Sequence, residues 1–348
     1  MKEAIVHPDV SVDIKDSPVP EPGPGQLLIK VLVSGTNPKD WKLPFWVNKS
    51  QNSGDDVAGL VEKVGDQVYE FAKGDRVAGF HIMMTEHGTF AEYAIVPAFA
   101  AFHIPKNISF EEAATVPLAA YTAATALFHS LQLPSPWDRD RATKRPVIIY
   151  GASTAIGAFG IKLAKKAGLH PLIAVGSKNS AFVLDLLDKE KGDAFVDYTQ
   201  FQSQDELAKK LREVVAGTGQ RCFQVFDCVS ENGSFEMLGK AIRGPPEEGT
   251  GFRPRITTVL PGKDYETVDS SVEVITTNVG HVHKDENEGS LLGLIWARVF
   301  AEGLRTGWMK PHPYEVVSGL EGLSDALKGL RDGTVRAKKM VIRIAEGN

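Results

Sequence analysis

The run VIIYGASTAIGAFG, residues 147–160, decides the fold, because a short apolar stretch turns through small residues into a helical pattern. Small residues at such a strand-to-helix turn let backbone N–H groups approach a pyrophosphate, and the N-terminus of the helix favours its negative charge. Three glycines occur in the run, although the strict GxGxxG spacing is absent, and Ser153 and Thr154 occupy its centre, where their hydroxyls could bond phosphate oxygens. The pattern predicts a dinucleotide site. The alternative is a plain helix start with small packing residues.

From this run to about residue 283, strand patterns alternate with helical ones. Further strands are expected at residues 171–175, 193–198, 221–229, 255–262 and 272–280. The segments between them, among them 180–192 and 205–216, have the composition of helices. Such alternation argues for an α/β fold with a doubly wound parallel sheet and helices on both faces.

The segments on either side of this series have a different pattern. About the first 115 residues are β-rich, with apolar runs broken by Gly, Pro and Asp turns, and residues 44–55 read as a loop. The closing run 338–344 is a strand pattern that we expect to return to the first domain. The sequence therefore predicts one domain formed by residues 1–116 and 284–348, and a second formed by residues 117–283.

Composition excludes several classes of protein. The net charge is −5 over 348 residues, whereas sequence-independent nucleic-acid binding needs clustered positive charge. No window approaches 18 unbroken apolar residues and the start lacks a signal-peptide core, so neither a membrane span nor export is expected. The only cysteines, Cys222 and Cys228, lie in one strand pattern that would keep them apart. We expect a reducing, cytoplasmic location.

The residues after the second strand of the series indicate which dinucleotide binds. Sites that prefer NAD usually end this strand with Asp or Glu, which binds the ribose hydroxyls. Here the strand runs into Gly176, Ser177, Lys178, Asn179 and Ser180 without an acid. A hydroxyl and an ammonium can accept a 2′-phosphate, so NADPH is favoured. The alternative is a polar loop with one solvated lysine.

Several motifs together resemble one family. SGTNPKDWK, GDDVAGLVEKVG, KGDRVAGF, GTFAEYAIVP, FEEAATVPLAAYTAATAL, VIIYGASTAIGA, VDY, HPYEVV and DGTVRAKKMVIRI occur in an order similar to that of the medium-chain dehydrogenase/reductase superfamily. The resemblance is to its zinc-independent branch of quinone reductases and fungal trans-enoyl reductases, and it covers nearly the whole chain. It implies a GroES-like β-rich substrate domain and a Rossmann domain, with the cofactor in the cleft between them.

The resemblance also implies roles for individual residues. Lys42 should approach the cofactor phosphates or the nicotinamide ribose, and Thr122 should lie beside the nicotinamide ring. The pyrophosphate should be lined by Ser153, Thr154, Ala155 and Ile156. The 2′-phosphate should be held by Ser177, Lys178 and Tyr198. The nicotinamide half should be bordered by Leu260, Val335 and Arg336. Tyr198 could instead be a strand-end aromatic residue, and Arg336 a solvated charge.

The zinc ligands of metal-dependent relatives are missing. Those relatives have a cysteine where this chain has Asn37 and a histidine where it has Asp55, and two cysteines cannot supply their four-cysteine structural site. His281 and His283 could share a face of a strand, but no matching ligand cluster accompanies them, so we expect ordinary surface or cleft histidines. The prediction is a protein without a metal.

A metal-free site favours a conjugated acceptor over a simple alcohol, whose oxidation is helped by a Lewis acid. Hydride added to an enone or quinone leaves a delocalised enolate that a few hydrogen bonds can stabilise. Lys42 and Tyr121 are candidate proton donors, although Tyr121 could equally be a packing residue. Apolar and aromatic side chains are the candidate lining of the acceptor pocket: Trp41, Phe45, Trp46, Phe80, Met83, Met84 and His281.

Three functions are compatible with these patterns. The first is an NADPH-dependent, zinc-independent reductase of a small quinone or of the C=C bond of an α,β-unsaturated carbonyl compound. The second is a trans-acting enoyl reductase that partners a polyketide synthase, which we rank lower because no basic patch for a carrier protein is evident. The third is a non-catalytic NADPH-binding protein. Relatives include monomers and homodimers joined along the segment 272–280, and both remain open here.

Overall fold

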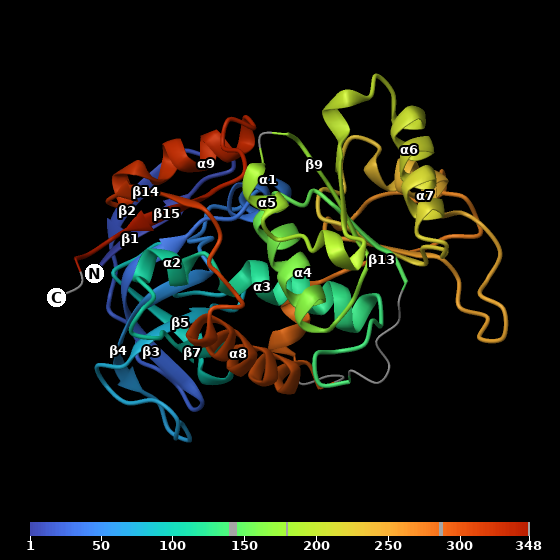
Figure 1. Cartoon of the computed structure of the whole chain (residues 1–348). Helices are drawn as coiled ribbons and strands as arrows, with labels where there is room; N and C mark the ends of the chain where they lie inside the picture. Colours follow the sequence, from blue (N-terminus) through green and yellow to red (C-terminus); the bar gives the residue numbers. More distant parts are fainter. Residues whose placement is uncertain (139–144, 179, 285–287, 347–348) are drawn as a thin grey trace. The chain divides into compact units, whose positions relative to one another are not determined.

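A computed structural model describes residues 1–138, 145–178, 180–284 and 288–346 (Figure 1). Its contacts divide the chain into two compact units. Unit 1 comprises Met1–Tyr121 and Gly280–Asn348, and unit 2 comprises Thr122–Val279. The boundaries expected from the sequence lie a few residues away from these.

Unit 1 is built on a seven-stranded sheet, in which the main strand order is β14-β15-β3-β4-β5-β7 and β6 also pairs with β3. Its strands are β3 (Gln26–Gly35), β4 (Asp56–Val64), β5 (Arg76–Phe80), β6 (Tyr93–Pro97), β7 (Ala101–His103), β14 (Tyr314–Ser318) and β15 (Lys339–Arg343). A separate hairpin pairs β1 (Lys2–Val6) with β2 (Val12–Asp16). The antiparallel pairing of β15 with β3 confirms that the end of the chain returns to the first domain.

The apolar side chains of β3 form the core of this sheet. Leu27, Ile29 and Val31 alternate along the strand and pack with Val57 of β4 and Val77 of β5, all of them fully buried. Because side chains at every second position of a strand share one face, these residues lie on the same side of the sheet.

The helices of unit 1 include one that the sequence did not predict. They are α1 (Lys39–Val47), α2 (Phe110–Ala114), α8 (Gly289–Thr306) and α9 (Leu323–Arg331), while α3 (Pro117–Ala124) crosses the boundary between the units. Residues 44–47 lie in α1 rather than in the expected loop, although Pro44 stands inside the helix. Proline lacks the N–H that would bond the carbonyl four residues earlier. That carbonyl, of Asp40, instead accepts a hydrogen bond from Ser53 Oγ at 2.7 Å.

Unit 2 contains a six-stranded, all-parallel sheet in the order β10-β9-β8-β11-β12-β13. The strands are β8 (Val147–Tyr150), β9 (Leu172–Gly176), β10 (Ala194–Asp197), β11 (Gln224–Asp227), β12 (Arg255–Thr258) and β13 (Glu273–Thr276). Counted within the unit, the order is 3-2-1-4-5-6, which is the Rossmann arrangement. The predicted doubly wound parallel sheet is thus confirmed.

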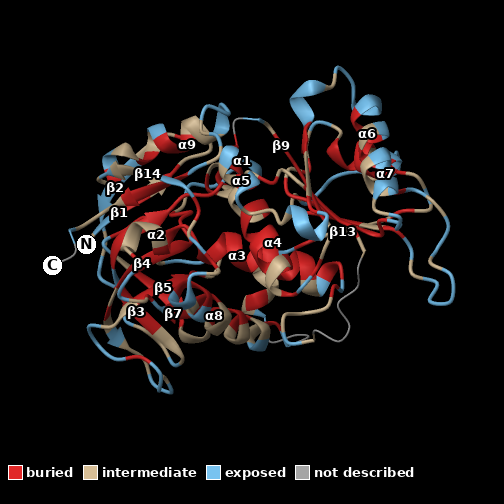
Figure 2. Ribbon diagram, in the orientation of Figure 1, coloured by how far each residue is buried: buried red, intermediate tan, exposed pale blue. Residues whose placement is uncertain are grey.

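Helices cover both faces of this sheet, and its central strands β8, β9 and β11 are largely buried, whereas the edge strand β13 is half-buried (Figure 2). On one face Gly160 of α4 (Ala155–Lys166) lies directly over Phe226 and Ile149. On the other face α6 (Gln204–Gly217) and α7 (Ser234–Ile242) share an apolar cluster with the alternate strand residues, such as Val225. The expected helix at 180–192 is wrong, because only α5 (Ala181–Leu184) and a 3-10 turn (Lys189–Lys191) form there.

Short turns complete the described elements. A π-helical segment, Thr125–Ser130, continues from α3. The other 3-10 turns are Ala98–Ala100, Tyr198–Gln200, Val279–His283 and Leu320–Gly322. Within the described part of the chain, no helix combines the length and the apolar composition that crossing a membrane requires.

Candidate cofactor and acceptor sites

The predicted phosphate loop lies at the point where the strand order of unit 2 reverses. Strands β8 and β11 are neighbours there, and ligands of open α/β sheets bind outside the carboxyl ends of such strands. Gly151 follows β8 with φ of +78°, and a Cβ at this position would lie 2.8 Å from the side chain of Val229. At Gly157 a Cβ would lie 2.4 Å from the Gly151 carbonyl oxygen. Both glycines are therefore required by the shape of the turn.

Within this loop the two hydroxyl residues have different roles. Thr154 is the N-cap of α4, where its Oγ1 accepts from the Gly157 N–H at 3.1 Å and donates to the Gly151 carbonyl at 2.7 Å. Both bonds lie inside the loop, so Thr154 caps α4 and shapes the turn. Ser153, Ala155 and Ile156 are half-buried around the N-terminus of α4, whose dipole favours an anion.

The residues predicted to hold the 2′-phosphate lie at adjacent strand ends. Gly176 of β9 and Asp197 of β10 are paired in register, and Ser177, Lys178 and Tyr198 follow them directly. Lys178 and Tyr198 are exposed, and Ser177 is half-buried with its Oγ 3.5 Å from Ser180 Oγ. Asn179 lies outside the described residues. The structure thus brings this predicted group together.

Asp197 was not predicted from the sequence as part of this site. The acidic residue sought there was one at the end of the second strand, whereas Asp197 ends the third. The carboxylate of Asp197 accepts from the hydroxyl of Thr199 at 2.7 Å and from its N–H at 3.0 Å. These bonds, together with one from the backbone of Lys178, hold the pKa of Asp197 below its usual range. The carboxylate joins the two loops and is buried, so its oxygens face the protein.

A second missed residue, Asp227, ends β11 beside the phosphate loop. Its Oδ1 accepts from the N–H groups of Val229 and Ser230 at 3.0 and 2.9 Å, and its Oδ2 accepts from Ser234 Oγ at 2.5 Å. Burial raises the pKa of this carboxyl, against the effect of those bonds. Asp227 therefore fixes the turn whose Val229 packs over Gly151. Its position at a strand end was the available signal in the sequence.

In unit 1, helix α1 carries four of the predicted site residues. The Nζ of Lys42 lies 5.5 Å from the ring centre of Trp41 and 6.0 Å from that of Trp46. Both distances are within the range of a cation–π interaction. Lys42 is buried, whereas Phe45 and Trp46 are 61% and 45% exposed. The exposed rings form an apolar surface beside a lysine whose ammonium two indoles hold in place.

Other predicted residues of unit 1 lie in an aromatic cluster. Tyr121 is fully buried, stacks edge-on against Phe300, and donates its hydroxyl proton to the Gly293 carbonyl at 3.0 Å. Burial raises the pKa of Tyr121 far above its usual value. These observations favour the packing alternative for Tyr121 over proton donation. Phe80 is equally buried, with its ring 5.7 Å from Tyr121 and 4.5 Å from His283, which favours a packing role there too.

The remaining predicted residues are spread over both units. Met83 is half-buried and Met84 exposed in the loop after β5, and His281 is half-buried in the 3-10 turn Val279–His283. In unit 2, Thr122 is buried in α3, and Leu260 follows β12. Back in unit 1, Val335 packs near Leu330, and the exposed Arg336 donates from Nε to the Gly333 carbonyl at 3.1 Å.

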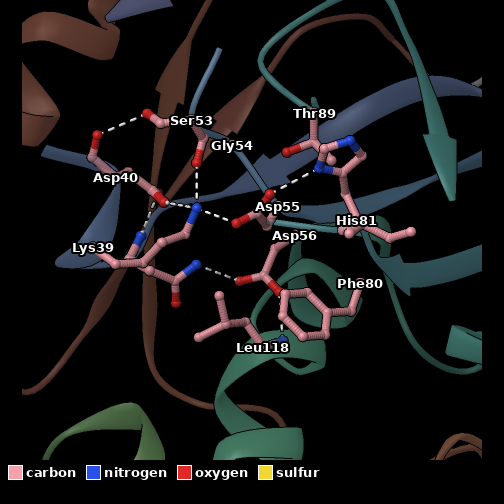
Figure 3. A network of polar contacts seen from close by, with 12 residues as sticks. Lys39, Asp40, Ser53, Gly54, Asp55, Asp56, Phe80, His81, Thr89 and Leu118 are labelled. Carbon is pink, nitrogen blue, oxygen red and sulfur yellow. Dashed lines mark hydrogen bonds and ion pairs between the residues drawn. The ribbon is translucent and has the colours of Figure 1, made fainter. Parts of the chain in front are cut away.

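The positions that carry zinc ligands in metal-dependent relatives are occupied by a hydrogen-bonded network (Figure 3). Asn37 donates to Asp56 Oδ2 at 2.8 Å and accepts from Lys339 at 2.8 Å. Asp55 is ion-paired with Lys39 and bonded to His81 Nδ1 at 2.8 Å. No group of three or more His, Cys, Asp and Glu side chains in the described ranges could hold a metal ion.

Comparisons with known proteins agree with this geometry. Residues 23–106 match the alcohol dehydrogenase GroES-like domain. The chain is 38% identical over 322 residues to trans-enoyl reductase fsr4 of Gibberella fujikuroi, covering 92% of this chain and 91% of the relative. The chain belongs to the medium-chain dehydrogenase/reductase superfamily. It is an oxidoreductase of the branch that contains trans-enoyl reductases.

Solved structures of superfamily members share the fold over nearly the full length of this chain. The CurK enoyl reductase superposes with a TM-score of 0.75 at 17% identity, covering 99% of both chains. A mycobacterial protein solved in complex with NADPH superposes with a TM-score of 0.75 at 19% identity, again over 99% of each chain. The GroES-like and Rossmann folds expected from the sequence are therefore confirmed.

Proposed function

We propose that this reductase transfers hydride from NADPH to a C=C bond conjugated to a carbonyl group, without zinc. The observation that carries the proposal is an intact dinucleotide loop at the switch point of a Rossmann sheet, in a chain that aligns along 92% of its length with a trans-enoyl reductase. Quinones, which are also conjugated acceptors, are the alternative substrates.

The chemistry of a conjugated acceptor suits the side chains present. Bound NADPH supplies the hydride, and the reacting carbonyl then carries enolate charge. A fixed cation or donor near that oxygen stabilises it, and a low-dielectric site strengthens the effect. Lys42, held between two indole rings, is the proton donor and cation that we propose for this role. Tyr121 is not proposed, since its proton is bonded to a main-chain carbonyl.

The assay that tests this function is NADPH consumption with a panel of acceptors. The panel contains an enoyl thioester of N-acetylcysteamine, a small enone and a benzoquinone, each measured with NADPH and with NADH. Turnover of the thioester or enone with NADPH supports the proposal. Turnover of quinones alone supports the alternative, and NADPH binding without turnover of any acceptor supports a non-catalytic protein. Stoichiometric zinc in the active purified enzyme would overturn the proposal that it works without zinc.

A second candidate is action in trans on a chain bound to the carrier protein of a polyketide synthase. The printed name of the 38% identical relative, a trans-enoyl reductase, favours it. The discriminating measurement compares the same enoyl chain on N-acetylcysteamine and on a phosphopantetheinylated carrier protein. A kcat/KM at least about a hundredfold higher on the carrier protein supports this partner, because tethering adds binding energy that a free thioester lacks. Equal values on both substrates reject it.

The preference for NADPH is tested by reversing the charge of Lys178. Lys178→Glu places an anion where we propose the 2′-phosphate to bind, so KM for NADPH should rise about tenfold or more while KM for NADH changes much less. Lys209→Glu is the matched control, because Lys209 is an exposed lysine of α6 in the same unit. An equal rise in KM for NADPH and for NADH would reject the assignment of the 2′-phosphate site.

Two further proposals concern the state of the protein in the cell. We propose a cytoplasmic enzyme, because Cys222 and Cys228 are both free and buried, as in proteins of reducing compartments. A monomer or a homodimer is compatible with the sheet, whose edge strand β13 could pair with a second copy. Sedimentation of the purified protein distinguishes the two states.

A further inference from the structure

Four charged side chains form a closed cluster in unit 1 (Figure 3). The ammonium of Lys39 bonds the carboxylates of Asp40, at 2.9 Å, and of Asp55, and also the carbonyl of Ser53. Asp55 in turn bonds His81 at 2.8 Å. Both carboxylates and His81 are at most 2% exposed. Lys39, Asp40, Asp55 and His81 are called the quartet below.

His81 is bonded on both sides of its ring. Its Nε2 lies 2.9 Å from the carbonyl oxygen of Glu86. Its Nδ1 lies 2.8 Å from the carboxylate of Asp55. His81 therefore links the buried carboxylate to the main chain of the loop that follows β5.

Three members of the quartet have shifted pKa values. Burial, the largest effect, raises the pKa of Asp40 to about 7, although the charge of Lys39 opposes it. Burial alone would lower the pKa of Lys39, but the charges of Asp40 and Asp55 outweigh it and raise that pKa. Burial would raise the pKa of Asp55, yet Lys39 and His81 lower it. Two charges inside the quartet thus depend on their neighbours, so removing one member disturbs the rest.

The quartet connects two segments far apart in the sequence. Lys39 and Asp40 begin helix α1, and Asp40 Oδ2 also accepts from the Asn37 N–H at 2.7 Å. His81 directly follows β5 and bonds the tip of the loop through Glu86 and, at 3.2 Å, through Thr85 Oγ1. Helix α1 carries Lys42 and Trp46, and the loop Ile82–Gly88 carries Met83 and Met84. Both segments therefore hold residues predicted to face the cofactor or the acceptor.

Stability alone does not account for such a network. Buried ion pairs lose so much solvation that well-packed apolar residues of similar volume are often equally stabilising or better. An ionic cluster has instead a strict geometry, because each charge must meet its opposite at bonding distance. It therefore fixes one arrangement of the segments that it joins.

We propose that the quartet is the positioning device of the acceptor site, with His81 as the residue that sets the loop Ile82–Gly88 against helix α1. His81, Lys39, Asp40 and Asp55 act through Lys42, Trp46, Met83 and Met84, and they touch neither substrate nor cofactor. The substrate-related part of this inference rests on the proposed reductase function.

The test replaces His81 by glutamine, which keeps a hydrogen-bond donor but lacks the two opposite ring nitrogens that bond Asp55 and Glu86. With a short and a long enoyl thioester, KM for the acceptor should rise about tenfold and the preference between the two should change, because small misplacements of a site cost this much. KM for NADPH should change less than KM for the acceptor, because the phosphate loop and the 2′-phosphate group lie in the other unit. A fall in kcat that is equal for both acceptors, with KM unchanged, would overturn the proposal.

Two further variants keep the test decisive. His103→Gln removes an exposed histidine that pairs with Asp75 at 3.1 Å in the same unit, so its kinetics should match those of the wild type. Thr85→Val affects only the exposed loop side of the network and should shift KM in the same direction by about threefold. If His81→Gln does not fold, Thr85→Val takes its place in the test. An unchanged KM for the acceptor and an unchanged preference between the short and the long thioester in Thr85→Val would then reject the proposal.

A readout without substrate separates this inference from the proposed function. If the wild type turns over no acceptor, the reductase proposal fails, but hydrogen exchange still reports on the network. Backbone amides of residues 82–88 should exchange about tenfold faster in His81→Gln, since a lost hydrogen bond lowers the cost of local opening. Unchanged exchange in that loop would reject the quartet as a positioning device.

Discussion

At the scale of single residues, His283 shows how burial sets a charge state. Its Nε2 donates to the Phe80 carbonyl at 3.0 Å, and its ring lies 4.5 Å from that of Phe80. Burial, the largest effect, lowers the pKa of His283 to about 4, although the bond to Phe80 and the charge of Asp55 oppose it. His283 is therefore neutral at physiological pH, and Nδ1 has no hydrogen-bond partner among the described residues.

A pH dependence of stability follows from this shift. The folded pKa of about 4 lies below the unfolded value of 6.5, so the unfolded chain takes up the proton first. The stabilisation is present above pH 6.5 and is lost as the pH falls toward 4. His283→Gln keeps a donor to Phe80 and removes the titration. At pH 5 the wild type should thus have lost about 2 kcal/mol more of its pH 7 stability than the variant, measured by urea unfolding. Parallel losses in both proteins would show that His283 does not titrate in this way.

Individual site residues were predictable where the backbone pattern dictates them. The turn at Gly151 and the placement of Ser177 and Lys178 after the second strand follow from the sequence pattern. Tyr198 was implied by the family resemblance, and it lies near them because parallel strands end at one edge of a sheet. The pairing of Lys39 with Asp55 and His81 was not predictable. These residues are brought together by strand pairing between β4 and β5 and by helix α1, and no local pattern encodes that proximity.

At the scale of elements, the strands were easier to predict than the helices. The alternation of strand and helix patterns marked all six strands of the parallel sheet. Helix α1 was missed because Pro44 normally ends a helix, and only the contact of Ser53 with the Asp40 carbonyl offsets the lost bond. The expected helix at 180–192 failed for the opposite reason: its local pattern is helical, but tertiary structure bends the chain into shorter turns.

The turn between β8 and α4 can be tested with a glycine pair. Gly151 and Gly219 both have positive φ, +78° and +70°, but only at Gly151 would a Cβ meet neighbouring atoms. Gly219→Ala should cost about 1 kcal/mol of stability from backbone strain alone. Gly151→Ala should cost more and should also weaken NADPH binding about tenfold or more, because the loop must shift away from Val229.

Denaturant unfolding and cofactor titration of both variants provide the measurement. Gly219→Ala controls for the strain of placing alanine at a positive φ, because a Cβ at this position would meet no neighbouring atom. Gly219 follows the end of α6, away from the strand ends. If both variants bound NADPH like the wild type, Gly151 would not belong to the dinucleotide site.

At the scale of the whole molecule, unit 1 is discontinuous and its closure depends on a few long-range bonds. Lys339, in the last strand, donates to Asn37 at 2.8 Å and to Asp56 at 2.6 Å. Asp56 also accepts from the Leu118 N–H at 2.6 Å, so three distant parts of the chain meet at one buried carboxylate. The sequence indicated that the last strand returns, but it did not indicate the ion pair that anchors it.

Lys339→Met should therefore destabilise unit 1 strongly. It leaves Asp56 as a buried charge without its cation, which costs about 3–5 kcal/mol. In the double variant Lys339→Met/Asp56→Asn the uncompensated charge is gone, so part of the loss should be recovered. Tryptophan fluorescence during urea unfolding reports mainly on unit 1, which contains four of the five tryptophans: Trp41, Trp46, Trp296 and Trp308. Additive losses in the double variant would mean that Lys339 and Asp56 contribute independently, and the closing strand would then be held by its backbone pairing with β3 and β14 rather than by this ion pair.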